Sequence, residues 1–266
     1  MIFIDFIVIM VYVESGMNKK NIAILVFIIV LLAGAFALYL QRNAILSLKQ
    51  NIEITSSATP VIQDQKITDN TKPFKINITY PQVAGQDEFN KIVKDMVDKE
   101  VADFKANSLA NDEAVKKVDP AGYASFPREY DIEIGYDKGI VDQNAISVVI
   151  NIYNFEGGAH GAEYSKAVNF NPQTKKEIAL ADLFPNNPNY LKTISDFSIK
   201  DLKKQIDPQM ADDSWLTTGA GPTAENYSVF LINPSTGSGQ ATLTFYFQQY
   251  QVAAGAAGSF KVVFPK

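Results

Sequence analysis

The chain has 266 residues, enough for one large domain or two small ones, and 47% of them are hydrophobic, which excludes a wholly disordered protein. It contains no cysteine and a single histidine. Disulfides, thiolate catalysis, cysteine-bound zinc and any triad or metal site that needs two imidazoles are therefore excluded. The formal net charge of −5 at pH 7 argues against a nucleic-acid-binding protein.

Residues 22–40 form an apolar run without a charge, directly after Lys19 and Lys20. As a helix this run would be about 28 Å long, close to the roughly 30 Å hydrocarbon core of a membrane. We predict one transmembrane helix here, with the following domain on the outside of the cell membrane. In the alternative interpretation the run is a signal peptide that is cleaved near Ala37, because Ala35-Phe36-Ala37 resembles a small-residue cleavage site.

Residues 1–21 are predicted to be a short cytoplasmic N-terminus. Met17-Asn18-Lys19-Lys20 is typical of the basic start of an exported protein, so we interpret residues 1–16 as an extension ahead of the true start codon. The alternative is a second, short membrane segment within these apolar residues.

Residues 41–72 are rich in Ser, Thr, Gln, Asn and Asp and show little periodicity. This composition predicts a flexible stalk that separates the membrane from the domain. The remaining residues, 73–266, are predicted to form one extracytoplasmic domain.

Alternating apolar and polar residues predict strands in this domain. The expected strands cover residues 74–80, 130–136, 146–155, 167–170, 243–248 and 260–264. Both faces of the segment 146–155 are apolar, which predicts a central strand covered on both sides. A turn is expected at residues 171–175.

Two segments have the apolar spacing of amphipathic helices. Apolar residues recur at helical intervals from Phe89 to Phe104, with Asp87 as the expected N-cap. A second helix is predicted over residues 189–206, ended by Pro208. Strands interspersed with two isolated helices indicate an α+β fold, with a mostly antiparallel sheet and helices packed on it.

The segment Gly157-Gly158-Ala159-His160-Gly161 follows directly after the predicted central strand. Its glycines permit close backbone approach. One hypothesis is a loop that presents His160, with Glu156 beside it, to a ligand. The alternative is a tight turn whose histidine packs or hydrogen-bonds locally.

Two aromatic residues complete the candidate binding set. Trp215, the sole tryptophan, is expected on a loop where it could anchor a sugar or a protein, although a buried tryptophan is the alternative. Tyr250 follows a predicted strand and could belong to a tyrosine-rich binding surface or to the outer face of an ordinary sheet.

The order of several short motifs resembles one extracytoplasmic family. That family occurs in RsiV-type anti-sigma factors and at the N-terminus of PdaC-type peptidoglycan deacetylases. The motifs that carry the resemblance are Tyr80-Pro81, Phe89-Asn90, Gly157-Gly158-Ala159-His160, Phe170-Asn171 with Leu180-Ala181-Asp182-Leu183-Phe184, and Phe245-Tyr246-Phe247 with Ala256-Ala257-Gly258.

The resemblance implies a domain that faces the cell wall, and in its anti-sigma members such a domain binds lysozyme. This chain departs from those relatives. The short segment before residue 22 leads us to expect no sigma-binding module, and we expect no attached deacetylase, whose metal site a single histidine could not supply. Ala254-Gly255 also stand where the family commonly has a Pro-Tyr pair.

We therefore expect a non-enzymatic, membrane-anchored binding domain of the cell envelope, without a metal or other cofactor. Its expected ligand is a lysozyme-like hydrolase or the glycan of peptidoglycan, with His160, Glu156, Trp215 and Tyr250 as contacts. The alternatives are a cell-wall hydrolase that uses His160 with a carboxylate and a purely structural envelope protein.

Overall fold

The computed structural model describes residues 18, 20, 33–46, 59–125, 128–210, 212–235 and 242–266. The chain divides into two compact units, Met1–Ala58 and Thr59–Lys266, and we call the second the sheet domain. In the first unit, residues 33–46 are helical and exposed. Residues 22–32 of the predicted transmembrane segment, most of the predicted cytoplasmic N-terminus and residues 47–58 of the predicted stalk lie outside the described residues. No helix within the described ranges has the length and apolarity required to span a membrane.

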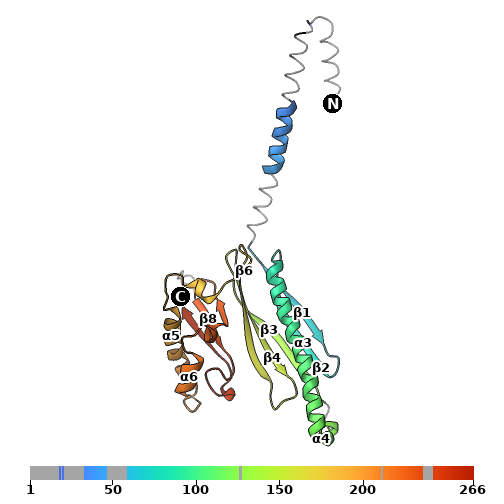
Figure 1. The fold of residues 1–266 in the computed structure, drawn as a ribbon, viewed down its shortest axis with the longest axis vertical. Coiled ribbons are helices and arrows are strands. Elements are labelled where there is room, and N and C mark those ends of the chain that lie inside the picture. The colour runs from blue at the N-terminus through green and yellow to red at the C-terminus, as the bar shows by residue number, and fades with distance from the viewer. Residues whose placement is uncertain are drawn as a thin grey trace. The chain divides into compact units, whose positions relative to one another are not determined.

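The first sheet of the sheet domain has six strands in the order β1-β2-β3-β4-β5-β6 (Figure 1). The strands β2 and β3 are parallel, and all other neighbours are antiparallel. A parallel pair requires a long crossover, which the two helices α3 and α4 supply. The bounds are β1 (Ile62–Asp69), β2 (Phe74–Val83), α3 (Asp87–Val118), α4 (Pro120–Ser125), β3 (Tyr130–Val141), β4 (Ile146–Phe155), β5 (Ala162–Asn171) and β6 (Lys176–Glu177). The predicted α+β class is confirmed, and the first sheet is mixed: mostly antiparallel, as predicted, with β2 and β3 as a parallel pair.

The strand β1 corrects the predicted extent of the stalk. It pairs with β2 along its whole length, from Ile62 opposite Val83 to Asp69 opposite Ile76. Only two of its eight residues, Ile62 and Ile67, are apolar, because it is an edge strand that faces solvent along much of its surface. The apolar alternation that marks a half-buried strand is therefore missing from its sequence.

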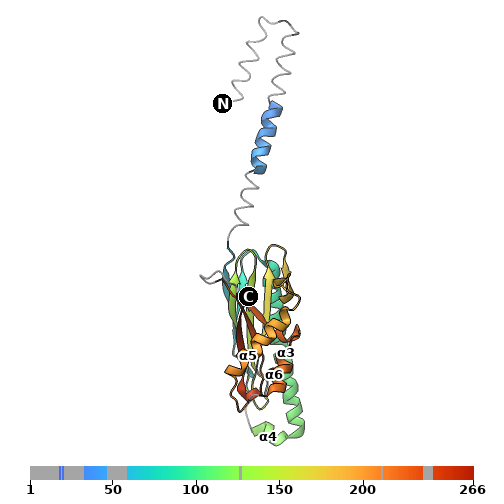
Figure 2. The ribbon, with the colours of Figure 1, turned by 90° about the vertical axis from the view of Figure 1, so that its left-hand side faces the viewer.

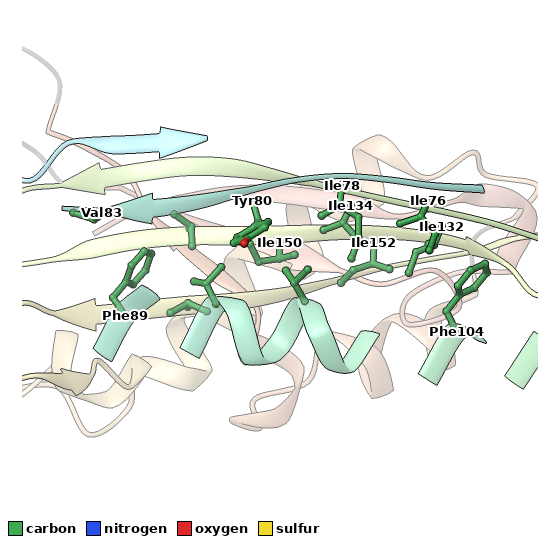
Figure 3. Packing of buried hydrophobic residues seen from close by; sticks show 14 of the residues in the cluster. Ile76, Ile78, Tyr80, Val83, Phe89, Phe104, Ile132, Ile134, Ile150 and Ile152 are labelled. Carbon is green, nitrogen blue, oxygen red and sulfur yellow. The ribbon is translucent and has the colours of Figure 1, made fainter. Parts of the chain in front are cut away.

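The helix α3 covers one face of the first sheet and forms the main core with it. Phe89, Val93, Val97 and Phe104 are each at most 1% exposed. They pack against isoleucines of β2, β3 and β4, as Figure 3 shows for Ile76, Ile78, Ile132, Ile134, Ile150 and Ile152. The prediction that this helix face is core is confirmed.

The bounds of α3 differ from the prediction at both ends. The N-cap is Gln86 and Asp87 is the first helical residue, so the acidic side chain lies in the first turn, where it complements the helix dipole. The helix continues to Val118, well beyond Phe104. The exposed side of its first half carries Lys-Asp pairs at i,i+4 spacing, which add to the stability of an isolated helix; they are Lys91–Asp95, Lys94–Asp98 and Lys99–Asp103.

A second, three-stranded sheet has the order β7-β8-β9 and carries its own helices. Its elements are the 3-10 helix η1 (Leu180–Leu183), α5 (Tyr190–Gln205), α6 (Asp213–Gly219), η2 (Glu225–Tyr227), β7 (Phe230–Ile232), β8 (Thr242–Phe247), η3 (Gly255–Ala257) and β9 (Phe260–Pro265). The helix α5 matches the predicted second helix. A separate core lies between these helices and the three strands, with Ile194, Leu202, Tyr227, Phe245 and Phe247 among its buried members.

The second sheet packs on the face of the first sheet that α3 leaves uncovered. Figures 1 and 2 show α5, α6 and β8 on the opposite side of the first sheet from α3. Val149 of β4 is fully buried against Leu231 and Tyr246 of the second sheet. The prediction that residues 146–155 form a central strand covered on both sides is therefore confirmed.

Two buried polar side chains fix the edge strand β7 to this face. Asn169 Nδ2 donates to the carbonyl oxygen of Phe230 at 2.9 Å, and the Ile232 N–H donates to Ser147 Oγ at 2.8 Å. Ser147 Oγ in turn donates to Asn169 Oδ1 at 2.6 Å. These bonds satisfy backbone groups of β7 that point away from β8, so they hold the two sheets in one orientation.

Candidate functional site: a polar groove between the two sheets

A groove of about 470 Å³ lies where the first sheet extends beyond the second. Its floor consists of side chains from β2, β3, β4 and β5, and its wall comes from the end of β8 and the start of β9. The lining is mostly polar and uncharged or aromatic, and includes Asn77, Thr79, Asn151, Tyr153, Ser165, Tyr246, Gln248, Ser259 and Phe260.

The strand register arranges the floor in two rows. Gly135, Asn151 and Ser165 are opposite one another on β3, β4 and β5. Glu133, Tyr153 and Glu163 form the next row on the same three strands. Because side chains alternate between the two faces of a strand, both rows point away from α3 and into the groove.

Gly135 leaves the middle of the floor open. A Cβ atom built at this position would meet no atom within 4 Å, and its backbone does not have a positive φ. A side chain could therefore be accommodated here without strain, and it would project into the space between the two rows. The depth of the groove depends on the absence of that side chain.

One clasp between the sheets closes one side of the groove. Tyr246 Oη and Lys261 Nζ each donate to Asp137 Oδ2 at 2.7 Å, and the Lys261 ammonium lies 4.5 Å from the centre of the Tyr246 ring. Partial burial alone would raise the pKa of the Asp137 carboxyl, but the bonds from Lys261 and Tyr246 outweigh it and hold this pKa below its ordinary value. Burial, together with the bond to Asp137, raises the pKa of the Tyr246 phenol, which stays protonated as a donor.

A second clasp joins Gln248 to the backbone of β5. The Ser165 N–H donates to Gln248 Oε1 at 2.8 Å, and Gln248 Nε2 donates to the Ser165 carbonyl at 3.1 Å. The side-chain amide thus pairs with β5 as a neighbouring strand would. The two clasps set the distance between the floor and the wall.

Three of the four predicted site residues lie together at the β4–β5 loop. His160 is exposed, and its Nε2 atom lies 3.5 Å from Tyr250 Oη, while its Nδ1 atom lies 2.8 Å from the Gly161 carbonyl. Trp215 Nε1 donates to the Tyr250 carbonyl at 2.9 Å. Neither contact of His160 is a carboxylate, which the hydrolase alternative required.

Glu156 lies apart from these three residues. Its Oε1 atom accepts from Asn107 of α3 at 3.4 Å, and its backbone carbonyl accepts from Asn111 at 3.0 Å. The chain turns between Glu156 and His160 at Gly157, whose φ is +88°. The two residues therefore point to different sides of the sheet, although only four positions separate them.

Trp215 lies on a helix and not on the predicted loop. Asp212 is the N-cap of α6, and its side chain accepts from the N–H groups of Ser214 and Trp215. The bonds from these N–H groups and from the Ser214 hydroxyl lower the pKa of Asp212. The acidic residues before Trp215 thus begin a helix that directs the indole toward Tyr250.

Tyr250 occupies the space that Gly255 leaves free. A Cβ atom at Gly255 would lie 2.1 Å from Cζ of the Tyr250 ring, which is far too close for a stable contact. The Tyr250 ring therefore lies over Gly255. The family that the chain resembles commonly has a Pro-Tyr pair at Ala254-Gly255, so in this chain the tyrosine ring at this place comes from position 250 instead.

We expect Gly255→Ala to displace the Tyr250 ring and to destabilise the sheet domain by about 1–3 kcal/mol. Trp215 is the sole tryptophan and is bonded to the Tyr250 carbonyl, so its fluorescence emission should shift. Gly158→Ala is the matched control, because the nearest atom to its Cβ would be 3.8 Å away. An unchanged emission spectrum in Gly255→Ala would contradict this account of the ring.

The sequence reasoning missed most of the groove. Asn151, Tyr153 and Gly135 belong to predicted strands, but nothing local in the sequence shows that they are neighbours across the sheet. Within the ranges that the structure describes, no group of three or more His, Cys, Asp or Glu side chains could hold a metal ion.

Two family models match the chain. One, described as deacetylase PdaC, matches residues 67–163, and the other, described as a protein of unknown function (DUF3298), matches residues 181–266. The groove takes most of its floor from the first matched region and its wall from the second. The resemblance to PdaC-type proteins is thus supported, whereas the match to the anti-sigma family is not shown.

One curated relative corrects the expected function. The chain is 26% identical over 212 residues to the peptidoglycan-N-acetylmuramic acid deacetylase PdaC of Bacillus subtilis, and the match covers 80% of this chain. The chain spans 42% of the length of that relative. The prediction of a non-enzymatic protein is overturned, because the relative is named as an enzyme that acts on peptidoglycan.

Two solved structures are similar to the chain. A DUF3298 family member from Bacteroides fragilis is 15% identical with a TM-score of 0.42, and the match covers 77% of this chain and 88% of that protein. A DUF3298 family protein from Pseudomonas aeruginosa is 12% identical with a TM-score of 0.47, and the match covers 79% of this chain and 92% of that protein. Both TM-scores lie below 0.5, which is too low to establish a shared fold.

Proposed function

We propose that the sheet domain binds the glycan strands of peptidoglycan in the groove between its two sheets and takes part in peptidoglycan deacetylation at the cell envelope. The observation that carries this proposal is the groove itself. It has the size of a small-molecule site, and its lining combines neutral hydrogen-bonding side chains with aromatic rings.

The chemistry of the lining fits a sugar chain. Sugars present hydroxyl and acetamido groups, which need both donors and acceptors when they leave water. Asn77 and Asn151 supply amides, and the hydroxyls of Thr79 and Ser259 can donate or accept. The Tyr153 ring on the floor offers an apolar surface for the carbon face of a sugar.

Peptidoglycan is the polymer of the cell wall, so the proposed function requires the sheet domain to lie outside the cytoplasm. In helix 33–46 the side chains of Phe36, Leu38, Tyr39 and Leu40 are 52–67% exposed. Apolar side chains on several sides of a helix favour a hydrophobic surrounding. We propose that residues 22–40 anchor the chain in the cell membrane, with secretion after cleavage near Ala37 as the alternative.

Gly135→Val tests the proposed groove. We expect the valine side chain to occupy the open floor and to weaken the affinity of the full chain for purified peptidoglycan about tenfold, which corresponds to about 1.4 kcal/mol, measured by sedimentation over a range of peptidoglycan concentrations. Folding should be retained, because the position has room for a side chain and valine favours strands.

Ala162→Val is the matched control for this experiment. It also introduces a valine, at an exposed position of β5 that does not line the groove. Equal sedimentation of the wild type, Gly135→Val and Ala162→Val would contradict binding in the groove. Failure of the wild type to sediment with peptidoglycan would contradict the proposed function as a whole.

Soluble lysozyme is a second probe, because an acidic protein attracts a basic partner. We measure lysozyme without peptidoglycan, because lysozyme cleaves that polymer, and we expect weak binding that salt removes. Binding of lysozyme without any binding of peptidoglycan would show that the ligand of the domain is a protein and not a glycan.

A further inference from the structure

Two carboxylates lie on either side of an aromatic ring in the floor of the groove. Glu133 on β3 is opposite Tyr153 on β4, and Tyr153 is opposite Glu163 on β5. Neighbouring strands are about 4.8 Å apart, so the two glutamate backbones are separated by roughly 10 Å across the tyrosine. All three residues line the groove.

The positive charges near the groove are already paired. Lys261 is bound by Asp137 at 2.7 Å. Lys75 Nζ lies 2.8 Å from Asp131 Oδ2 but 4.0 Å from Glu133 Oε1, so its closer partner is Asp131.

The negative charge of Glu163 is less compensated by nearby positive charge than that of Glu133. Its side chain is exposed, and among the residues that the structure describes it forms no ion pair within 4.0 Å. The row through Tyr153 therefore has excess negative charge, while the adjacent row of Gly135, Asn151 and Ser165 is neutral.

We infer that the groove selects glycan whose amino sugars carry a free amine over fully N-acetylated glycan. This inference rests on the proposed function, and it assigns Glu133, Tyr153 and Glu163 as the residues that determine the preference. An acetamido group is neutral, whereas hydrolysis of its C–N bond by water releases acetate and leaves a protonated amine. That ammonium fits between a carboxylate and the face of a tyrosine ring.

The solvent exposure of the two carboxylates explains why the preference should be moderate. Glu133 and Glu163 both remain in contact with solvent, and water weakens an exposed ion pair. We expect the full chain to bind a tetramer of glucosamine about fivefold more tightly than a tetramer of N-acetylglucosamine. The preference should decrease as salt is raised to 0.5 M, because salt screens exposed charges.

The double variant Glu133→Gln with Glu163→Gln tests the assignment by isothermal titration with both tetramers. It should bind the two tetramers with equal affinity, and its affinity for the N-acetylated tetramer should be unchanged. Glu113→Gln with Glu225→Gln is the matched control, since it changes the net charge equally at exposed positions outside the groove. The control should keep the full preference.

The outcomes separate this inference from the proposed function. If the wild type binds both tetramers equally, the selectivity is wrong and glycan binding stands. If the preference persists in the groove variant, residues other than Glu133 and Glu163 determine it. If it also disappears in the control variant, it comes from net charge and not from these residues. If neither tetramer nor peptidoglycan binds, the proposed function itself is contradicted.

Discussion

Replacing Phe104 with alanine should destabilise the sheet domain by about 3–5 kcal/mol, measured by urea unfolding. Phe104 is 1% exposed and lies at the far end of the contact between α3 and the first sheet. Its ring packs edge-to-face on Phe74, with ring centroids 5.7 Å apart. Alanine would leave a cavity between the helix and β2 that the rigid sheet cannot fill.

Leu109→Ala is the control for this change. Leu109 is on the same helix but is 50% exposed, so we expect its substitution to change the free energy of unfolding by less than about 0.5 kcal/mol. Similar losses in the two variants would contradict packing of Phe104 on the sheet as the cause, because alanine itself favours a helix.

Asn169→Leu should weaken the attachment of the second sheet to the first. The leucine removes the donor to the Phe230 carbonyl and the acceptor of the Ser147 hydroxyl, inside an interface where Asn169 is 5% exposed. Each buried group left without a partner costs about 1–3 kcal/mol. Since the groove wall belongs to the second sheet, peptidoglycan binding should fall together with stability.

Asn70→Leu provides the comparison, because Asn70 is exposed in the turn after β1. Its free energy of unfolding and its peptidoglycan binding should be close to those of the wild type. If Asn169→Leu unfolds in one transition with unchanged stability, the polar bonds at β7 do not hold the sheets together.

The longest elements of the fold follow from periodicity alone. The helix α3 and the strands β2, β3 and β4 have strong apolar patterns because each buries one or both faces in a core. The strand β1 and the helix α6 have no such pattern. The first is a polar edge strand, and the second is only seven residues long and is stabilised by its Asp212 cap.

The site was harder to predict because it depends on pairing between distant segments. His160, Tyr250 and Trp215 come together only because the β4–β5 loop, the segment after β8 and the start of α6 meet in space. Glu156 was grouped with His160 by proximity in sequence, and the positive φ of Gly157 separates them. A single histidine excludes triads and metal sites that need two imidazoles, but it does not exclude enzymatic function.

The attachment of β7 also bears on solubility. An open strand edge exposes backbone groups on which another polypeptide can add a strand, and this is a common start of aggregation. At β7 the Phe230 carbonyl and the Ile232 N–H are instead occupied by side chains from a different sheet. The β7 edge of the smaller sheet therefore has no free backbone groups at these two positions, so another copy of the protein cannot add a strand there.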